Sequence, residues 1–176
     1  MVAIPCRFES DRRHSRIPMF LTVHTTAAIA IGAQITNPAG AFLAGLVSHY
    51  ILDVIPHGDE TKWPNVTNGQ LAKLALFDHM ALVINLSALL VLKPGLDLTA
   101  PMALAILGSV APDYLMALYR LTTSYTALFW QKLQKIIGPL EKFHHLIHFH
   151  IIKYDPPFWV GAILQATIMA ALWILI

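Results

Sequence analysis

The sequence predicts an all-α protein, a polytopic membrane helical bundle of about five spans plus one amphipathic interfacial helix. Of its 176 residues, 56% are apolar and only 12% are charged, and the mean hydropathy is +0.59. Soluble domains carry roughly 25% charged residues, so part of this apolar surface is expected to face lipid. The apolar residues fall in runs close to the roughly 20 that a helix needs to cross a bilayer, and no run alternates as a barrel strand would.

Five apolar segments are the predicted spans, and local signals mark their ends. The first is the least apolar and carries His24 among threonines. Asn37-Pro38 opens the second as a cap and a first-turn proline, and Lys93-Pro94-Gly95 ends the third. Thr99 caps the fourth, which Pro112-Asp113 is expected to interrupt. The spans cover residues 17–36, 39–56, 71–92, 99–119 and 158–176.

A sixth helix, over residues 124–150, is predicted to lie at the membrane surface. Its apolar residues follow a helical stripe with charged residues around it, which is the pattern of an interfacial amphipathic helix. Gly138-Pro139 is expected to break this helix into two pieces. The apolar stripe consists of Leu128, Phe129, Leu133, Ile136, Ile137 and Leu140.

Lysine and arginine placement gives the orientation. Residues 1–16 are predicted to form a basic cytoplasmic N-terminal segment, and residues 17–176 are predicted to form one membrane-embedded helical domain. With the N-terminus in the cytoplasm, Lys93 alone among the 12 lysines and arginines falls outside, as the positive-inside rule favours. The C-terminus is then outside.

Two alternatives for the N-terminus stay open, a cleaved leader and translation from Met19. Either would remove residues 1–18 or more from the mature protein.

This orientation collects the ionisable side chains of the spans in one cytoplasmic layer. Such residues are costly inside a membrane and commonly functional, so a layer to which every span contributes predicts a site. Hydropathy and the lysine and arginine count define the topology, and the histidines play no part in it. The predicted metal ligands in this layer are His24, His49, Asp53, His57, His79, Asp113, His144, His145 and His148.

The spacing of these residues suits metal binding. His49 and Asp53 are four residues apart and share a helix face, as do His144 and His148, so each pair can reach one ion. Nitrogen and carboxylate ligands without thiolates suit zinc, and also manganese or iron, and the set is large enough for two ions. The predicted catalytic residues are Asp59 and Asp78, one of which would act as general base or hold a ligand histidine.

Two parts of the chain share an order of features and form a candidate hairpin repeat, residues 24–57 and 79–119. Each has a histidine early in an outgoing helix and an aspartate late in the returning one. The returning helices carry GLVSHYILD and GSVAPDYLM. A pseudo-symmetric pair of hairpins would bring both histidines and both aspartates together at one end.

The segments HTTAAIAIGA, AGLVSHYILDVIPHGD and LGSVAPDYL resemble the bacterial membrane-bound metal-dependent hydrolases, including their LexA-regulated inner-membrane members. The matching positions are His24 and Gly108 to Asp113. The spacing of His49, Asp53 and His57 is similar to a ligand element of the helical zinc-dependent phospholipase C and nuclease superfamily. These resemblances imply a bacterial inner-membrane location, a zinc cluster in a helical bundle and a phosphoester substrate.

Three function classes follow. The first is a membrane hydrolase whose metal-activated hydroxide attacks a phosphoester or lipid-type substrate at the cytoplasmic leaflet. The second is a metal-ion or proton transporter or channel, which predicts ionisable residues continuing toward the outer leaflet, where few occur. The third is a non-catalytic membrane protein with dispersed histidines. The expected partners are the lipid bilayer and a phospholipid or other phosphoester; a net charge of +2 does not indicate nucleic-acid binding.

Overall fold

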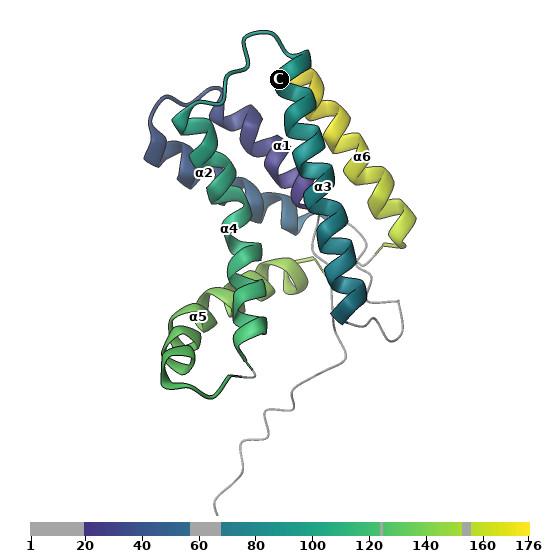
Figure 1. Ribbon diagram of the computed structural model, residues 1–176. Helices are drawn as coiled ribbons and strands as arrows, with labels where there is room; N and C mark the ends of the chain where they lie inside the picture. The colour runs from purple at the N-terminus through teal and green to yellow at the C-terminus, as the bar shows by residue number, and fades with distance from the viewer. Residues whose placement is uncertain (1–19, 57–67, 124, 153–155) are drawn as a thin grey trace, which may run out of the picture.

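All regular structure that the computed structural model describes is helical, as predicted (Figure 1). The described residues are 20–56, 68–123, 125–152 and 156–176. Six helices lie in these ranges, and their order matches the five predicted spans and the predicted interfacial helix. They are α1 (Leu21–Gly32), α2 (Pro38–Val54), α3 (Asn68–Leu92), α4 (Ala100–Thr122), α5 (Leu128–His150) and α6 (Phe158–Leu175).

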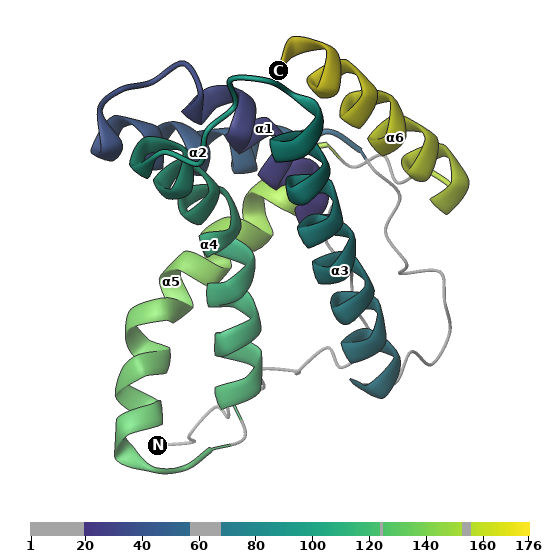
Figure 2. The same ribbon diagram turned by 45° about the horizontal axis from the view of Figure 1, so that its top comes forward.

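The helix α1 is the centre of the bundle. It packs against α2, α3, α4 and α6, with α2 and α4 on one side of it and α3 and α6 on the other (Figures 1 and 2). We predicted a full span over residues 17–36, but α1 has 12 residues and therefore rises about 18 Å, less than the roughly 30 Å of a hydrocarbon core. Most of its side chains are buried, so it is an interior helix covered by its neighbours.

The first turn of α1 is capped by two other helices. Its own N-cap residue, Phe20, offers no side-chain acceptor. The Asp78 carboxylate of α3 accepts from the Leu21 amide at 2.7 Å, and from the Thr22 amide at 3.3 Å and its hydroxyl at 2.8 Å. Gln165 of α6 accepts from the Phe20 amide at 3.0 Å. The free amides of a helix N-terminus are thus satisfied by residues distant in sequence.

Two glycines allow α2 and α4 to cross in backbone contact. A Cβ atom on Gly45 would lie 2.0 Å from the Ala105 carbonyl oxygen, and one on Gly108 would lie 2.2 Å from the Phe42 carbonyl oxygen. No side chain fits at either position. The crossing is symmetric, because each glycine meets the residue three positions before the other (42 before 45, 105 before 108). It brings the C-terminal half of α2 against α4.

Both proline-containing helices continue where the sequence predicted interruptions. The helix α4 runs through Pro112, and α5 runs through Pro139, which we expected to divide it. An internal proline removes one backbone hydrogen bond, but packing on both sides of it can hold the helix together. Gly138 lies near the Tyr119 ring of α4, and further along α5 the buried His144 side chain contacts residues of α2 and α4.

The outer surface of the bundle is strongly apolar. Among the described residues, two helices, Ala72–Leu92 within α3 and Ala100–Thr122, are long and apolar enough to cross a membrane, whereas the predicted spans at α2 and α6 are shorter. On α3, Phe77 is 67% exposed and Val91 79% exposed. Soluble monomers rarely show apolar patches this continuous, so these faces suit contact with lipid. The other exposed large apolar residues of α3 are Leu76, Met80, Val83, Ile84 and Leu92.

Candidate metal centre

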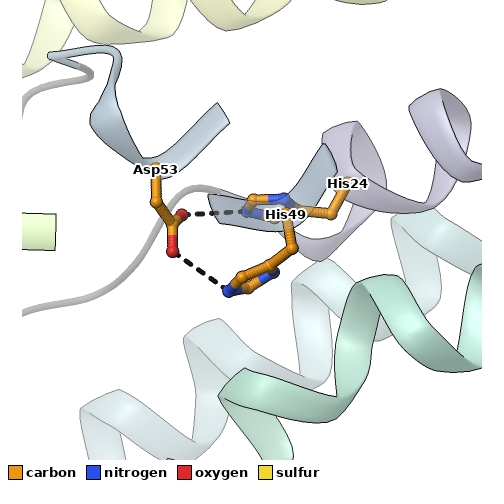
Figure 3. A group of neighbouring side chains, drawn as sticks. All are labelled: His24, His49 and Asp53. Atoms are coloured by element: carbon orange, nitrogen blue, oxygen red, sulfur yellow. Dashed lines mark ion pairs between the residues drawn. The ribbon is translucent and has the colours of Figure 1, made fainter. Parts of the chain in front are cut away.

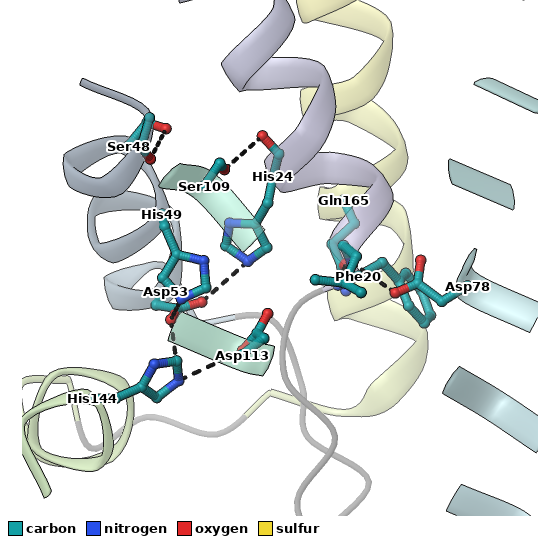
Figure 4. A network of polar contacts seen from close by, with 12 residues as sticks. Phe20, His24, Ser48, His49, Asp53, Asp78, Ser109, Asp113, His144 and Gln165 are labelled. Atoms are coloured by element: carbon teal, nitrogen blue, oxygen red, sulfur yellow. Dashed lines mark hydrogen bonds and ion pairs between the residues drawn. The ribbon is translucent and has the colours of Figure 1, made fainter. Parts of the chain in front are cut away.

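Five ionisable side chains from four helices meet in the interior of the bundle (Figure 4), and Figure 3 shows three of them, His24, His49 and Asp53. His24 comes from α1, His49 and Asp53 from α2, Asp113 from α4 and His144 from α5. None is more than 7% exposed. Within this cluster, two groups of three side chains could hold a metal ion: His24, His49 and Asp53, and His49, Asp113 and His144.

Asp53 is the hub of the cluster. Its carboxylate oxygens lie 3.3 Å from His24 Nε2, 3.0 Å from His49 Nε2 and 3.6 Å from His144 Nε2. His144 Nε2 also lies 3.8 Å from Asp113 Oδ1. Two atoms that each sit about 2.0–2.1 Å from one zinc ion at a tetrahedral angle are about 3.4 Å apart. The contacts of His24 and His144 with Asp53 are longer than most hydrogen bonds, which measure 2.7–3.2 Å, and fit ligands around an ion, whereas the 3.0 Å contact of His49 fits either.

The two buried carboxylates have imidazole rings as their neighbours. Among the described residues, no backbone amide or hydroxyl donates to the side-chain oxygens of Asp53 and Asp113, which are shielded from solvent. Burying an ionised carboxylate without hydrogen bonds or a cation is unfavourable by several kcal/mol. A divalent cation among these oxygens and imidazole nitrogens would remove that penalty, so the donor set fits a metal ion.

Local structure explains why these side chains converge. His49 and Asp53 follow Gly45 at intervals of four residues, so both lie on the face that the helix crossing presses toward α4. The Ser109 hydroxyl of α4 donates to the His24 carbonyl at 3.0 Å and fixes α1 against α4. The His24 and His49 rings then stack with centroids 4.3 Å apart.

His144 is neutral at pH 7 in this environment. Desolvation lowers the pKa of its imidazole to about 4, although the nearby Asp53 carboxylate favours the protonated form. Its contacts with Asp53 and Asp113 are therefore not pairs of full opposite charges. A neutral imidazole is the form that binds metals, so His144 is ready to act as a ligand without first losing a proton.

Two predicted site residues of α3 lie apart from the cluster. Asp78, predicted as a catalytic residue, is occupied by three hydrogen bonds from the first turn of α1. His79, predicted as a ligand, contacts the Ala75 carbonyl oxygen through Nδ1 and the Tyr114 hydroxyl through Nε2, both at 2.6 Å. Figure 4 shows Asp78 on the far side of Phe20 from the histidines.

The remaining predicted residues cannot be placed at the cluster. His145 follows the ligand-forming His144 on α5 and is half-buried. His148 belongs to α5, but its side chain lies outside the described part of the structure, as do His57 and Asp59 entirely. The structure thus brings together five of the predicted residues, and these come from α1, α2, α4 and α5.

Sequence reasoning missed the residues that build the site without ligating. Gly45 and Gly108 allow the crossing, and Tyr50 lines one side of the cluster with its ring centroid 5.3 Å from that of His49 and 6.0 Å from that of His144. A signal for the glycines was present, because each begins one of the two similar segments, GLVSHYILD and GSVAPDYLM. No local pattern marked Tyr50.

No family model, curated protein or solved structure matches this chain. The site is therefore interpreted from its own geometry and chemistry.

Proposed function

We propose that the protein is an integral membrane, metal-dependent hydrolase of a phosphoester or lipid-type ester. The observation that carries the proposal is the buried cluster, in which imidazole nitrogens approach carboxylate oxygens at 3.0–3.8 Å and no described amide or hydroxyl donates to those oxygens. The proposal agrees with the resemblance of the sequence to bacterial membrane-bound metal-dependent hydrolases.

We assign His24, His49 and Asp53 as ligands, because they form one of the groups that could hold an ion and both imidazoles approach the Asp53 carboxylate, with His144 beside them at 3.6 Å from Asp53. Two nitrogens and one oxygen, with an open fourth position for water, suit catalytic zinc, with manganese and iron as alternatives. A bound divalent ion would act as a Lewis acid toward an ester or phosphoester and activate water for its hydrolysis. Asp113 makes the longest contact in the cluster, 3.8 Å, and is assigned as the proton acceptor.

One ion accounts for the described side chains. The two groups that could hold a metal share His49, so five side chains do not supply two complete ligand sets. A second ion would need further ligands, for which His57 and Asp59 are the candidates by their position after Asp53 in the sequence.

The contacts away from the cluster argue against transport. A pathway through the bundle would need ionisable or free polar groups beyond the cluster. The buried Asn85 instead donates to Thr26 at 2.8 Å and accepts from the Trp173 indole at 2.8 Å. This polar group ties α1, α3 and α6 together. A purely structural role for dispersed histidines is also disfavoured, because the five ionisable side chains form two groups of three that share His49, each close enough to hold an ion.

We further propose a bacterial inner-membrane location with five passes, a cytoplasmic N-terminus and an external C-terminus, in which the short α1 makes its pass inside the bundle. The apolar exposed faces of α3 and the placement of lysine and arginine support this orientation. Reporter fusions at the two ends test it. Cytoplasmic reporter activity at both ends would contradict the odd number of spans.

Element analysis of the purified protein tests the metal centre. We expect about one zinc, manganese or iron ion per chain from the ligand count, and its loss in the double variant His49→Ala with Asp53→Ala. Asp97→Asn, at an exposed position in the α3–α4 loop, is the matched control and should keep the metal.

Chromogenic phosphoesters and carboxylic esters in detergent micelles then test hydrolysis. Chelation should abolish the hydrolysis, and added metal should restore it. Metal-free protein would overturn the proposal.

A further inference from the structure

A pocket of about 160 Å³ lies between α2, α4 and α5. Most of its lining is apolar and comes from all three helices. Phe42 and Leu46 line it from α2, Leu115 and Met116 from α4, and Leu140 from α5. This apolar part of the lining offers no side-chain hydrogen bonds to a polar ligand and favours hydrocarbon.

The pocket ends at the metal centre. His144, whose Nε2 lies 3.6 Å from Asp53, is also one of the pocket-lining residues. The other polar lining side chains are Tyr50, whose ring stands beside His144, and Glu141, one helical turn before it. An occupant would therefore have an apolar part among the helices and a polar part beside the ligands, which is the form of an amphiphile.

The size and position of the pocket narrow the occupant further. Pockets for whole small molecules usually measure about 300–1,000 Å³, so this one suits only part of a molecule, such as one hydrocarbon chain. Leu140 lines the pocket and is 48% exposed, and the neighbouring Phe143 is 48% exposed. The pocket thus reaches the apolar outer face of α5, from which a lipid chain can enter.

We propose that this pocket binds one hydrocarbon chain of a bilayer lipid, so that the hydrolysable ester or phosphoester of that lipid lies at the metal centre. The proposal rests on the hydrolase function and names its substrate class, a membrane lipid. The pocket then determines specificity for the chain, while the cluster acts on the head of the molecule.

Photolabelling with a palmitic acid analogue that carries a diazirine in its chain tests the pocket. The protein is placed in phosphatidylcholine nanodiscs, and labelled peptides are quantified by mass spectrometry. We expect saturable labelling of the α4 segment 111–116 that unlabelled palmitate competes away. Labelling of the exposed face of α3 should not saturate, and it serves as an internal reference.

Two substitutions on α4 form a matched pair. Ala111 lines the pocket, whereas Ala117 on the same helix is exposed and is not part of the lining. Ala111→Phe should fill the pocket and lower saturable labelling at least about tenfold, equivalent to about 1.4 kcal/mol of binding. Ala117→Phe should leave it unchanged. If Ala111→Phe lowers the yield of folded protein, labelling is measured instead in Leu46→Phe, which fills the pocket from α2.

Metal content, measured on the same samples, separates the two proposals. Undiminished labelling of a folded pocket-filled variant that retains its metal overturns the chain-binding pocket and leaves the metal centre standing. Saturable labelling that is lost in the variant, in protein that never contains metal, supports a chain-binding pocket and overturns the hydrolase. Loss of labelling with metal retained supports both.

Discussion

Asp53 is the residue on which the cluster depends, because three imidazole nitrogens lie 3.0–3.6 Å from its carboxylate. Asp53→Asn keeps the shape of the side chain but removes its negative charge. We expect the purified variant to retain less than about a tenth of the wild-type metal, since removing one ligand charge from a buried site costs well over 1.4 kcal/mol. Element analysis of the variant and the wild type after equal dialysis measures the retained metal.

His79→Ala is the informative comparison for Asp53→Asn. The sequence predicts His79 in the same layer as the cluster, but its ring contacts Tyr114 and the Ala75 carbonyl oxygen. We therefore expect His79→Ala to keep its full metal content. A variant that loses metal as Asp53→Asn does would show that His79 reaches the site in solution.

Asp78 is expected to act on stability and not on metal binding. Asp78→Ala removes the acceptor for the Leu21 and Thr22 amides and for the Thr22 hydroxyl. Loss of a helix cap costs about 0.5–2 kcal/mol, and burial of the freed amides places this case at the upper end. Unfolding in detergent micelles should reveal the loss, with Asp97→Ala as the exposed control. Metal loss with unchanged unfolding would instead make Asp78 part of the site.

At the scale of whole helices, the crossing of α2 and α4 determines the geometry of the site. Gly45→Ala would place a methyl group 2.0 Å from the Ala105 carbonyl oxygen, so the helices must separate. Overpacking costs about 1–3 kcal/mol, which exceeds the gain of up to about 1 kcal/mol from replacing a helical glycine by alanine. Unfolding should therefore begin at lower temperature, and metal content should fall because His49 and Asp53 move away from α4.

Gly40→Ala is the control for this prediction. Gly40 lies in the first turn of the same helix, and a Cβ atom there would meet nothing closer than 3.7 Å. We expect this variant to be at least as stable as the wild type. Equal destabilisation of both variants would mean that α2 loses stability through the substitution itself, and the crossing would not be the cause.

The helices could be predicted because their signals are local. Asn37 accepts from the Gly40 amide and Thr99 from the Met102 amide, as the cap residues in the sequence indicate, and Gly95 has a φ of 87° after α3. The short length of α1 was not predictable in this way. Its first turn depends on Asp78, 57 residues away in sequence, and apolar composition alone cannot distinguish an interior helix from a spanning one.

The site could be predicted in part for the same reason. The orientation of the spans was sufficient to group His24, His49, Asp53, Asp113 and His144, because it places helix ends in a common layer. The predicted orientation could not exclude His79 from the site. Hydropathy indicates only how deep a residue lies in the membrane, whereas packing determines the rotation of α3 about its axis and therefore the direction of the His79 side chain. The contact of His79 with Tyr114 is such a packing result.

At the scale of the whole molecule, ionisable side chains are buried beside small apolar cores, and many large apolar side chains are exposed. Asp53, Asp113 and the three histidines are buried, while Ile84, Val91 and Ile174 are 64%, 79% and 83% exposed. A bundle in water would gain by the reverse distribution. In a bilayer, helix association depends on close packing and interior polar contacts. The Gly45–Gly108 crossing and the bonds of Asn85 are of these kinds.

The same arrangement makes the metal a determinant of overall stability. The assigned ligands come from α1 and α2, and His144 and Asp113 add α5 and α4 beside them, so one ion would join helices that otherwise meet through close packing and a few hydrogen bonds. A ligand at 100 times its dissociation constant stabilises the folded state by about 2.7 kcal/mol, which for a chain of this size raises the Tm by about 5–10 °C. Chelation should therefore lower the Tm in detergent by that amount, and added metal should restore it.

The Asp53→Asn variant is the control. With chelator and with added metal, this variant should have the same, lower Tm, because the site that couples the helices is already lost. A chelator effect of equal size in this variant would show that the stabilising ion binds elsewhere in the chain.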